Sequence, residues 1–154
     1  MIRDKTGRRS SRGAILLAGA FLCLAPALPT AAMTANEAFA DGNRLYRDDL
    51  YWAALLRYRQ AGEAGMDSPL LHFNTGVAHY KAQQHIRARE SLVRAAESAE
   101  LRAISHYNLG LNAWAAGNEE EAADWFRRAR DQQQNEKIRD YATVALARLQ
   151  DVRR

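Results

Sequence analysis

The stretch AISHYNLGLNAWAAGNEEEAADWFRRARDQQQNE, residues 103–136, decides the fold, because its key residues recur elsewhere in the chain at a fixed interval. Gly42, Gly76 and Gly110 follow one another at intervals of 34 residues. Two columns of alanine and one column of large apolar residues keep the same interval: Ala54, Ala88 and Ala122; Ala61, Ala95 and Ala129; Tyr58, Leu92 and Phe126. A period of this length indicates a repeated supersecondary unit.

The spacing within each unit predicts two helices packed against each other. Positions are counted from residues 35, 69 and 103, where the three units begin. Glycine at the eighth position removes a side chain, so the second helix can lie close to the first. Alanine at the twentieth and twenty-seventh positions permits close contact from the other side, and the large residue at the twenty-fourth fills the space that remains. A glycine inside a helix costs roughly 1 kcal/mol relative to alanine, so its recurrence implies a packing role.

The pattern resembles the tetratricopeptide repeat family, whose unit is a 34-residue helix-turn-helix. The third unit carries the resemblance most clearly, in His106-Tyr107-Asn108-Leu109-Gly110, Trp114, Gly117-Asn118, Ala122, Trp125-Phe126 and Ala129. The resemblance implies an all-α fold, a right-handed α-solenoid of three tandem repeats at about residues 35–68, 69–102 and 103–136. The sequence departs from the family at position four, where Ala38, His72 and His106 replace an aromatic residue.

Local signals predict where several helices begin and end. Thr34 and Glu37 form a capping box, and Ser68 followed by Pro69 reads as an N-cap and a first helical residue. Gly117 suits a helix C-terminus. A C-terminal capping helix is predicted at about residues 136–151, with an apolar stripe at helical spacing: Ile138, Tyr141, Ala142, Ala145, Leu149 and Val152.

Residues 1–32 differ from the rest of the chain and are predicted to be a signal peptide. A basic start precedes an apolar run at residues 14–28, and Thr30-Ala31-Ala32 supplies the small residues that a signal peptidase reads. We expect cleavage after Ala32, which leaves residues 33–154 as the repeat domain in the periplasm or outside the cell. The alternative is an uncleaved leader whose residues 14–28 anchor the protein in the inner membrane.

The excess of positive charge belongs to the leader. Five of the 22 basic residues and one of the 18 acidic residues lie in residues 1–32, so the remainder carries 17 of each. A nucleic-acid-binding domain is expected to carry a basic excess, so no nucleic-acid partner is predicted. The single cysteine, Cys23, also lies in the leader, so the predicted repeat domain uses neither disulfides nor thiol chemistry.

The resemblance places positions two, five, nine, twelve and thirteen of each unit on the concave face. Aromatic residues at positions five and twelve would line this groove, and Arg47 and Lys81 at position thirteen could hold an acidic side chain or a carboxyl terminus. For the position-twelve residues Tyr46 and Tyr80, packing between helices is an equal alternative. The predicted partner-binding residues are Phe39, Asn43, Tyr46, Arg47, Phe73, Val77, Tyr80, Lys81, Tyr107, Leu111, Trp114 and Tyr141.

No set of residues supports catalysis, a metal or another cofactor. The sequence offers no nucleophile–base pair and no glycine-rich phosphate loop. His72 and His106 occupy equivalent positions in neighbouring units, too far apart to share a metal, and are expected to be half-buried packing residues. Trp52 and Trp125 lie on second helices, where packing is favoured over a contact on the convex face.

The sequence therefore predicts a non-enzymatic adaptor or scaffold of the bacterial envelope that binds a peptide or partner protein in its concave groove. The alternative is a membrane-tethered structural or regulatory subunit of an envelope complex, or an oligomerisation module that uses its end faces. The partner itself and the oligomeric state do not follow from the sequence.

Overall fold

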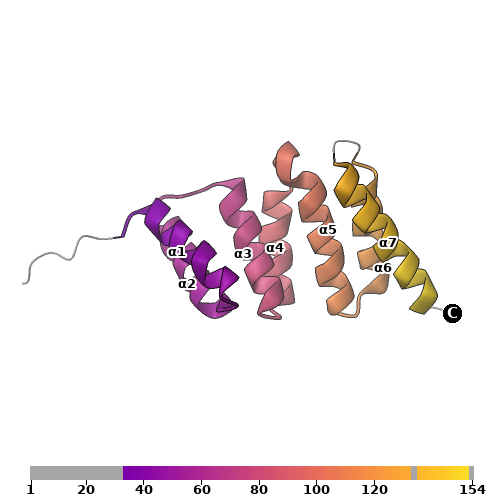
Figure 1. The fold of residues 1–154 in the computed structure, drawn as a ribbon, viewed down its shortest axis with the longest axis horizontal. Coiled ribbons are helices and arrows are strands. Elements are labelled where there is room, and N and C mark those ends of the chain that lie inside the picture. Colours follow the sequence, from indigo (N-terminus) through magenta and orange to yellow (C-terminus); the bar gives the residue numbers. More distant parts are fainter. Residues whose placement is uncertain (1–32, 133–134, 153–154) are drawn as a thin grey trace, which may run out of the picture. The chain divides into compact units, whose positions relative to one another are not determined.

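The structure is a computed structural model that describes residues 33–132 and 135–152, within a compact unit formed by residues 32–154. This part of the chain is all α-helical, with seven helices (Figure 1). Their bounds are α1 Ala35–Arg47, α2 Tyr51–Glu63, α3 Pro69–Lys81, α4 His85–Ala95, α5 Ala99–Ala115, α6 Glu119–Arg130 and α7 Glu136–Val152. The predicted signal peptide lies outside the described residues.

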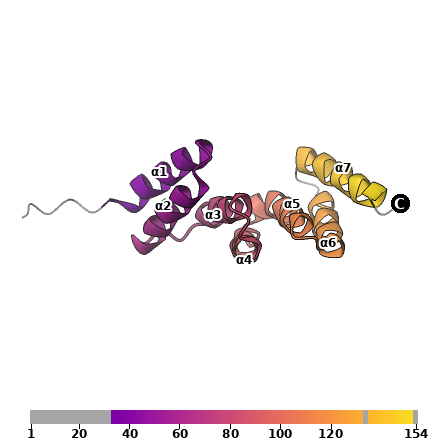
Figure 2. The same ribbon diagram turned by 90° about the horizontal axis from the view of Figure 1, so that it is seen from below.

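The helices pack in consecutive pairs, which confirms the predicted class of fold. The strongest contacts join α1 with α2, α3 with α4, and α5 with α6, and α7 packs on α6. In Figure 2, α1, α3, α5 and α7 lie on one side of the stack, here called the inner face, and α2, α4 and α6 lie on the other, the outer face. Three helix pairs and a capping helix are therefore present, as in tetratricopeptide repeats.

The repeated glycines accommodate the large residue at position twenty-four of their own unit. A Cβ atom added to Gly42 would lie 2.6 Å from the Tyr58 ring, and one added to Gly110 would lie 2.5 Å from the Phe126 ring. A Cβ atom at Gly76 would lie 2.7 Å from Leu92 Cγ. The glycine thus allows close helix packing by making room for this side chain.

The helix ends follow the local sequence signals. Both hydrogen bonds of the Thr34–Glu37 capping box are present, and the Ser68 hydroxyl accepts a hydrogen bond from the backbone N–H of Leu71, with Pro69 at the start of α3. The turn inside each unit passes through a left-handed residue, at Asp49 (φ 59°), Gln83 (φ 59°) and Gly117 (φ 80°). Only the third of these turns uses the residue type that adopts this conformation without strain.

One helix begins earlier than the predicted repeat boundary. Helix α5 starts at Ala99, about one turn before residue 103. The segment between α2 and α3 contains Gly65 with φ 96° and ends at Pro69, whereas residues 96–100 contain neither glycine nor proline. Nothing in the second connection therefore prevents helix formation, and α5 gains its extra turn.

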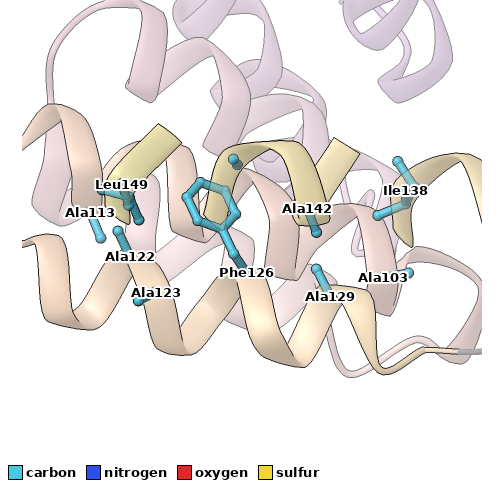
Figure 3. Packing of buried hydrophobic residues seen from close by; sticks show 10 residues of the cluster. Ala103, Ala113, Ala122, Ala123, Phe126, Ala129, Ile138, Ala142 and Leu149 are labelled. Carbon is cyan, nitrogen blue, oxygen red and sulfur yellow. The ribbon is translucent and has the colours of Figure 1, made fainter. Parts of the chain in front are cut away.

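The core is made largely of alanine around a few large side chains. Phe126 is fully buried and lies among alanines of α5, α6 and α7, as Figure 3 shows. Four residues of the predicted stripe of α7 are buried in this cluster: Ile138, Ala142, Ala145 and Leu149. The other two, Tyr141 and Val152, are exposed, so the buried stripe is narrower than predicted. A second cluster surrounds Tyr58 between α1, α2 and α3. Packing in these two clusters fixes the positions of α1, α3 and α5, the first helices of the three pairs, and therefore the positions of their side chains on the inner face.

Candidate functional site

A hollow of about 500 Å³ opens on the inner face. Its walls come from α1, α3 and α5, and Tyr58 of α2 reaches its floor. Five of the predicted partner-binding residues line it: Asn43, Tyr46, Arg47, Phe73 and Val77. The other lining residues are Ala40, Tyr58, Asn74 and Asn108. A hollow with apolar walls and a few directed polar groups is the usual form of a binding site.

Asn43 is held at the floor of the hollow by two neighbours. Its side-chain oxygen accepts hydrogen bonds from the Tyr58 hydroxyl at 2.9 Å and from Asn74 Nδ2 at 2.8 Å. Burial, followed by the nearby Tyr46, raises the pKa of Tyr58 to about 12, so Tyr58 remains a neutral donor. The second bond links α1 to α3, which fixes the amides of two adjacent units relative to each other.

Several amide groups at the hollow keep hydrogen-bonding capacity. Asn108 Nδ2 donates to the backbone oxygen of Ile104 at 2.8 Å, which orients the side chain and leaves its oxygen as an acceptor. Both hydrogen bonds of the Asn43 side chain use its oxygen, and no described residue accepts a hydrogen bond from its Nδ2, which therefore remains a donor. A side-chain amide can pair with both the N–H and the C=O of a peptide. The hollow can therefore bind a polypeptide backbone as well as apolar side chains.

The charge at the hollow is positive. Among the described residues that line it, only Arg47 is charged. Within residues 33–132 and 135–152, Arg47 has no ion-pair partner, whereas the neighbouring Arg44 pairs with Asp41 and Asp48. Lys81, at the equivalent position of the next unit, likewise has no acidic partner there and lies over the Tyr80 ring at 6.0 Å. Arg47, which lines the hollow, and Lys81, at the C-terminal end of α3, are thus both without an ion-pair partner among the described residues.

The aromatic residues at position five form separate ring contacts and have different roles. The Phe39 ring lies 5.9 Å from the Tyr58 ring, and the Tyr107 ring lies 6.0 Å from that of Tyr141. Burial, then Tyr141, raises the pKa of Tyr107. Phe39 and Tyr107 are half-buried supports of the core clusters, whereas Phe73 lines the hollow itself.

The position-twelve residues also divide between packing and exposure to the hollow. Tyr46 lines the hollow and packs on Tyr51 of α2, with the two rings 5.5 Å apart. Trp114 packs edge-on against Phe126, with 6.3 Å between the ring centres. Leu111, at position nine of the same unit, also packs against the core cluster that contains Phe126. Tyr80 is half-buried. Tyr46 therefore combines the two alternatives, because it lines the hollow and also packs on α2.

The binding residues predicted from the sequence do not include position six of the repeat. Ala40, Asn74 and Asn108 occupy this position in the three units, and all three line the hollow. They share the 34-residue interval with the glycines, so the signal was present in the sequence. Their role depends on how adjacent units lie against each other, which the interval alone does not specify.

The outer face carries a second hollow, of about 830 Å³, lined mainly by α2, α3 and α4. Trp52 lines it and is 64% exposed, so the prediction that Trp52 packs internally is wrong. No described helix covers this part of α2, and the equivalent Ile86 of α4 is also exposed. Trp125, in contrast, is half-buried: its ring lies 5.4 Å from that of His106, and its Nε1 donates to Glu121.

The histidines are packing and hydrogen-bonding residues. His72 bonds to Asp67 at 2.7 Å, and His79 bonds to Gln84 at 2.6 Å. Burial, more than any nearby charge, lowers the pKa of both His79 and His106. Among the described residues, no group of three histidine, cysteine or acidic side chains is placed to hold a metal ion. The same residues include no helix with the length and apolarity of a membrane span.

Comparison with solved structures places the fold among tetratricopeptide repeat domains. The SycD type III secretion chaperone of Yersinia enterocolitica, in complex with a peptide of the translocator YopD, matches with a TM-score of 0.67 at 11% identity, over 77% of this chain and 94% of that one. The first tetratricopeptide domain of Spaghetti (RPAP3), bound to the HSP90 peptide SRMEEVD, gives a TM-score of 0.65 at 19% identity, over 79% and 94%.

The N-terminal domain of stress-induced protein-1 (STI-1) from C. elegans is also similar, with a TM-score of 0.61 at 15% identity, over 72% of this chain and 93% of that one. No protein-family model matches the sequence, and the search of curated proteins finds no significant match. The likeness therefore establishes the fold alone.

Proposed function

We propose that this protein is a non-enzymatic adaptor that binds an extended segment of a partner protein along its inner face. The segment carries apolar side chains, which fill the hollow beside Phe73 and Val77, and at least one carboxylate, which meets Arg47 or Lys81. The fixed amides of Asn43, Asn74 and Asn108 bind the backbone of the segment. Two of the similar structures hold peptides, which supports a peptide as the kind of ligand this fold accommodates.

One observation carries the proposal: the hollow combines amides fixed by hydrogen bonds with a cation that, within the described part of the chain, has no ion-pair partner. A fixed amide loses little side-chain entropy when a ligand binds. Arg47 is exposed beside the apolar wall formed by Tyr46 and Phe73. Arginine can form bidentate bonds with a carboxylate. Together these features fit an acidic and apolar peptide better than a neutral small molecule or a nucleic acid.

A peptide-display selection tests this proposal. A library of random peptides is selected on the immobilised protein, and the strongest binders are synthesised with a fluorophore and measured by fluorescence anisotropy. We expect the selected peptides to contain acidic and apolar residues. Reversal of both inner-face charges, Arg47→Glu with Lys81→Glu, should raise the dissociation constant at least about tenfold, because each lost charged hydrogen bond is worth roughly 1.5–3 kcal/mol.

A matched control reverses charges elsewhere. Arg59→Glu with Arg127→Glu makes the same change in net charge on α2 and α6, where both arginines are exposed. This control should leave the dissociation constant unchanged. Phe73→Ala should also weaken binding, because the phenyl group forms part of the apolar wall. If the inner-face and control variants bind the selected peptides equally well, the inner face is not the site.

We further propose that the protein acts in the bacterial envelope after export. The basic start, the apolar run at 14–28 and the small residues before Met33 support this location. Mass spectrometry of the protein from its natural host tests it, with a mature N-terminus at Met33 as the expected result. An intact leader recovered in the membrane fraction would favour the alternative, a tethered structural or regulatory subunit.

A further inference from the structure

We infer that two copies of this chain associate through helix α7, arranged antiparallel about a two-fold axis at Val144. The inference does not depend on the inner-face function, because no residue of α7 lines the inner hollow; Tyr141 is the one predicted partner-binding residue that belongs to this surface. It rests on two features of α7: a helix-packing position that no described residue covers, and a pattern of charges on the exposed face that is complementary to itself.

The uncovered position follows from the repeat. Val144 follows Gly110 by 34 residues, so it occupies the position of the repeat glycines. Gly42, Gly76 and Gly110 each face a large side chain of the second helix of their own pair. The described residues place no such helix against α7 (Figure 1). Val144 is 52% exposed. The side of α7 that would face a second helix is therefore open.

The residues around Val144 form one exposed face. An α-helix turns through about 100° per residue, which places seven residues of α7 within about 60° of the direction of Val144. All seven are exposed, and the buried residues of α7 lie on the side that faces α6. The members of this face are Lys137, Asp140, Tyr141, Val144, Ala147, Arg148 and Asp151.

An antiparallel partner brings opposite charges together. With the two-fold axis at Val144, Lys137 of one copy lies opposite Asp151 of the other, and Asp140 lies opposite Arg148. Each pair occurs twice because the interface is isologous. Val144 meets its own counterpart at the centre. A parallel arrangement would instead place Lys137 against Lys137 and Asp140 against Asp140, so the charge pattern selects the antiparallel one.

These charges are available for such contacts. Within residues 33–132 and 135–152, Lys137, Arg148 and Asp151 form no ion pair, and Asp140 has only a contact of 3.9 Å with Arg139. Lys137 lies over the Tyr141 ring at 5.8 Å, which places both side chains on this face. Exposed ion pairs are individually weak, and one pair of helices is a small interface. We therefore expect a reversible dimer that depends on concentration and salt.

Sedimentation equilibrium of the full chain, with protein up to about 1 mM, tests this inference, because even weak specific association is detectable there. The wild type should shift from monomer to dimer. Asp140→Arg and Arg148→Asp should each raise the dissociation constant at least about tenfold, because each change makes two facing pairs repulsive. An equimolar mixture of the two variants should dimerise again, since the arginine introduced at position 140 of one variant then faces the aspartate introduced at position 148 of the other.

The outcomes separate this interface from others. Arg59→Asp on α2 is the matched control, because it changes one exposed charge far from α7 in sequence, and it should dimerise like the wild type. Circular dichroism checks that each variant is folded. A wild type that stays monomeric throughout, or a dimer that neither α7 variant weakens, would overturn the inference. Failure of the mixed variants to associate would overturn the antiparallel register.

Discussion

Replacing Gly110 with alanine tests why the glycine recurs every 34 residues. The new Cβ atom would lie 2.5 Å from both Cδ1 and Cε1 of Phe126 and 3.0 Å from its Cγ. Phe126 is fully buried and lies between the rings of Tyr107 and Trp114, at 5.6 Å and 6.3 Å. The ring cannot turn away without displacing these neighbours, so α5 and α6 have to move apart.

The size of the effect follows from two opposing contributions. Alanine favours the helix over glycine by roughly 1 kcal/mol, whereas an added methyl group in a packed core costs about 1–3 kcal/mol. Gly62→Ala isolates the first contribution, because Gly62 lies in α2 and a Cβ atom there would meet nothing within 4 Å. The free energy of unfolding of the Gly110→Ala protein should therefore fall about 1–3 kcal/mol below that of the Gly62→Ala protein.

Urea unfolding followed by circular dichroism measures both variants. A double-mutant cycle with Phe126→Ala identifies the contact responsible, because the added methyl group meets no ring in that background. There, Gly110→Ala should be neutral or stabilising. If Gly110→Ala stabilises the unmodified protein as much as Gly62→Ala does, or if its cost persists without the Phe126 ring, the account of the glycine column is wrong.

Further predictions concern the turns, the floor of the hollow and the pH dependence of stability. Gln83→Gly should raise the free energy of unfolding by up to about 1 kcal/mol, because glycine adopts the left-handed conformation of this turn without strain; an unchanged or lower urea midpoint would contradict this. Tyr58→Phe should lower it by about 1 kcal/mol, because the hydrogen bond to Asn43 is lost; an unchanged midpoint would count against that bond. Burial lowers the pKa of His79 and His106 below the ordinary value of 6.5, so the unfolded chain binds more protons in acid. The contribution of the two neutral histidines to stability is therefore complete above about pH 6.5 and declines as the pH falls below it. Replacement of both by glutamine should reduce the slope of the free energy of unfolding against pH, measured by urea titrations at successive pH values. An unchanged slope would exclude the two histidines as its cause.

The sequence predicted the helix pairs because their packing depends on residue size at fixed positions. Gly110 and Phe126 belong to the same unit, and their contact follows from the interval alone. The start of α5 was predicted one turn late, because the interval says nothing about a connection that lacks glycine and proline. Trp52 was expected to pack because it lies on a second helix, but both Trp52 and the equivalent Ile86 are exposed, and no described helix covers either residue.

The sequence could predict the residues of the candidate site only where their placement depends on a single repeat unit. Phe73 and Val77 line the hollow as their positions in the repeat indicated. The hydrogen bond between Asn43 and Asn74 joins different positions of adjacent units, so it depends on their relative placement, which no spacing in the sequence encodes. The sequence likewise does not show that Arg47 is free to bind a partner. This depends on which basic residues already form ion pairs with the acidic side chains near it.

Site-specific photo-crosslinking in producing cells tests most directly whether the inner face holds the partner. A benzoylphenylalanine residue replaces either Val77, which lines the inner hollow, or Ile86, which is 77% exposed on the outer face. The account predicts a covalent adduct with another protein from position 77, none from position 86, and loss of the adduct when Arg47 and Lys81 are changed to glutamate. Adducts from position 86 alone, or none from position 77, would contradict it.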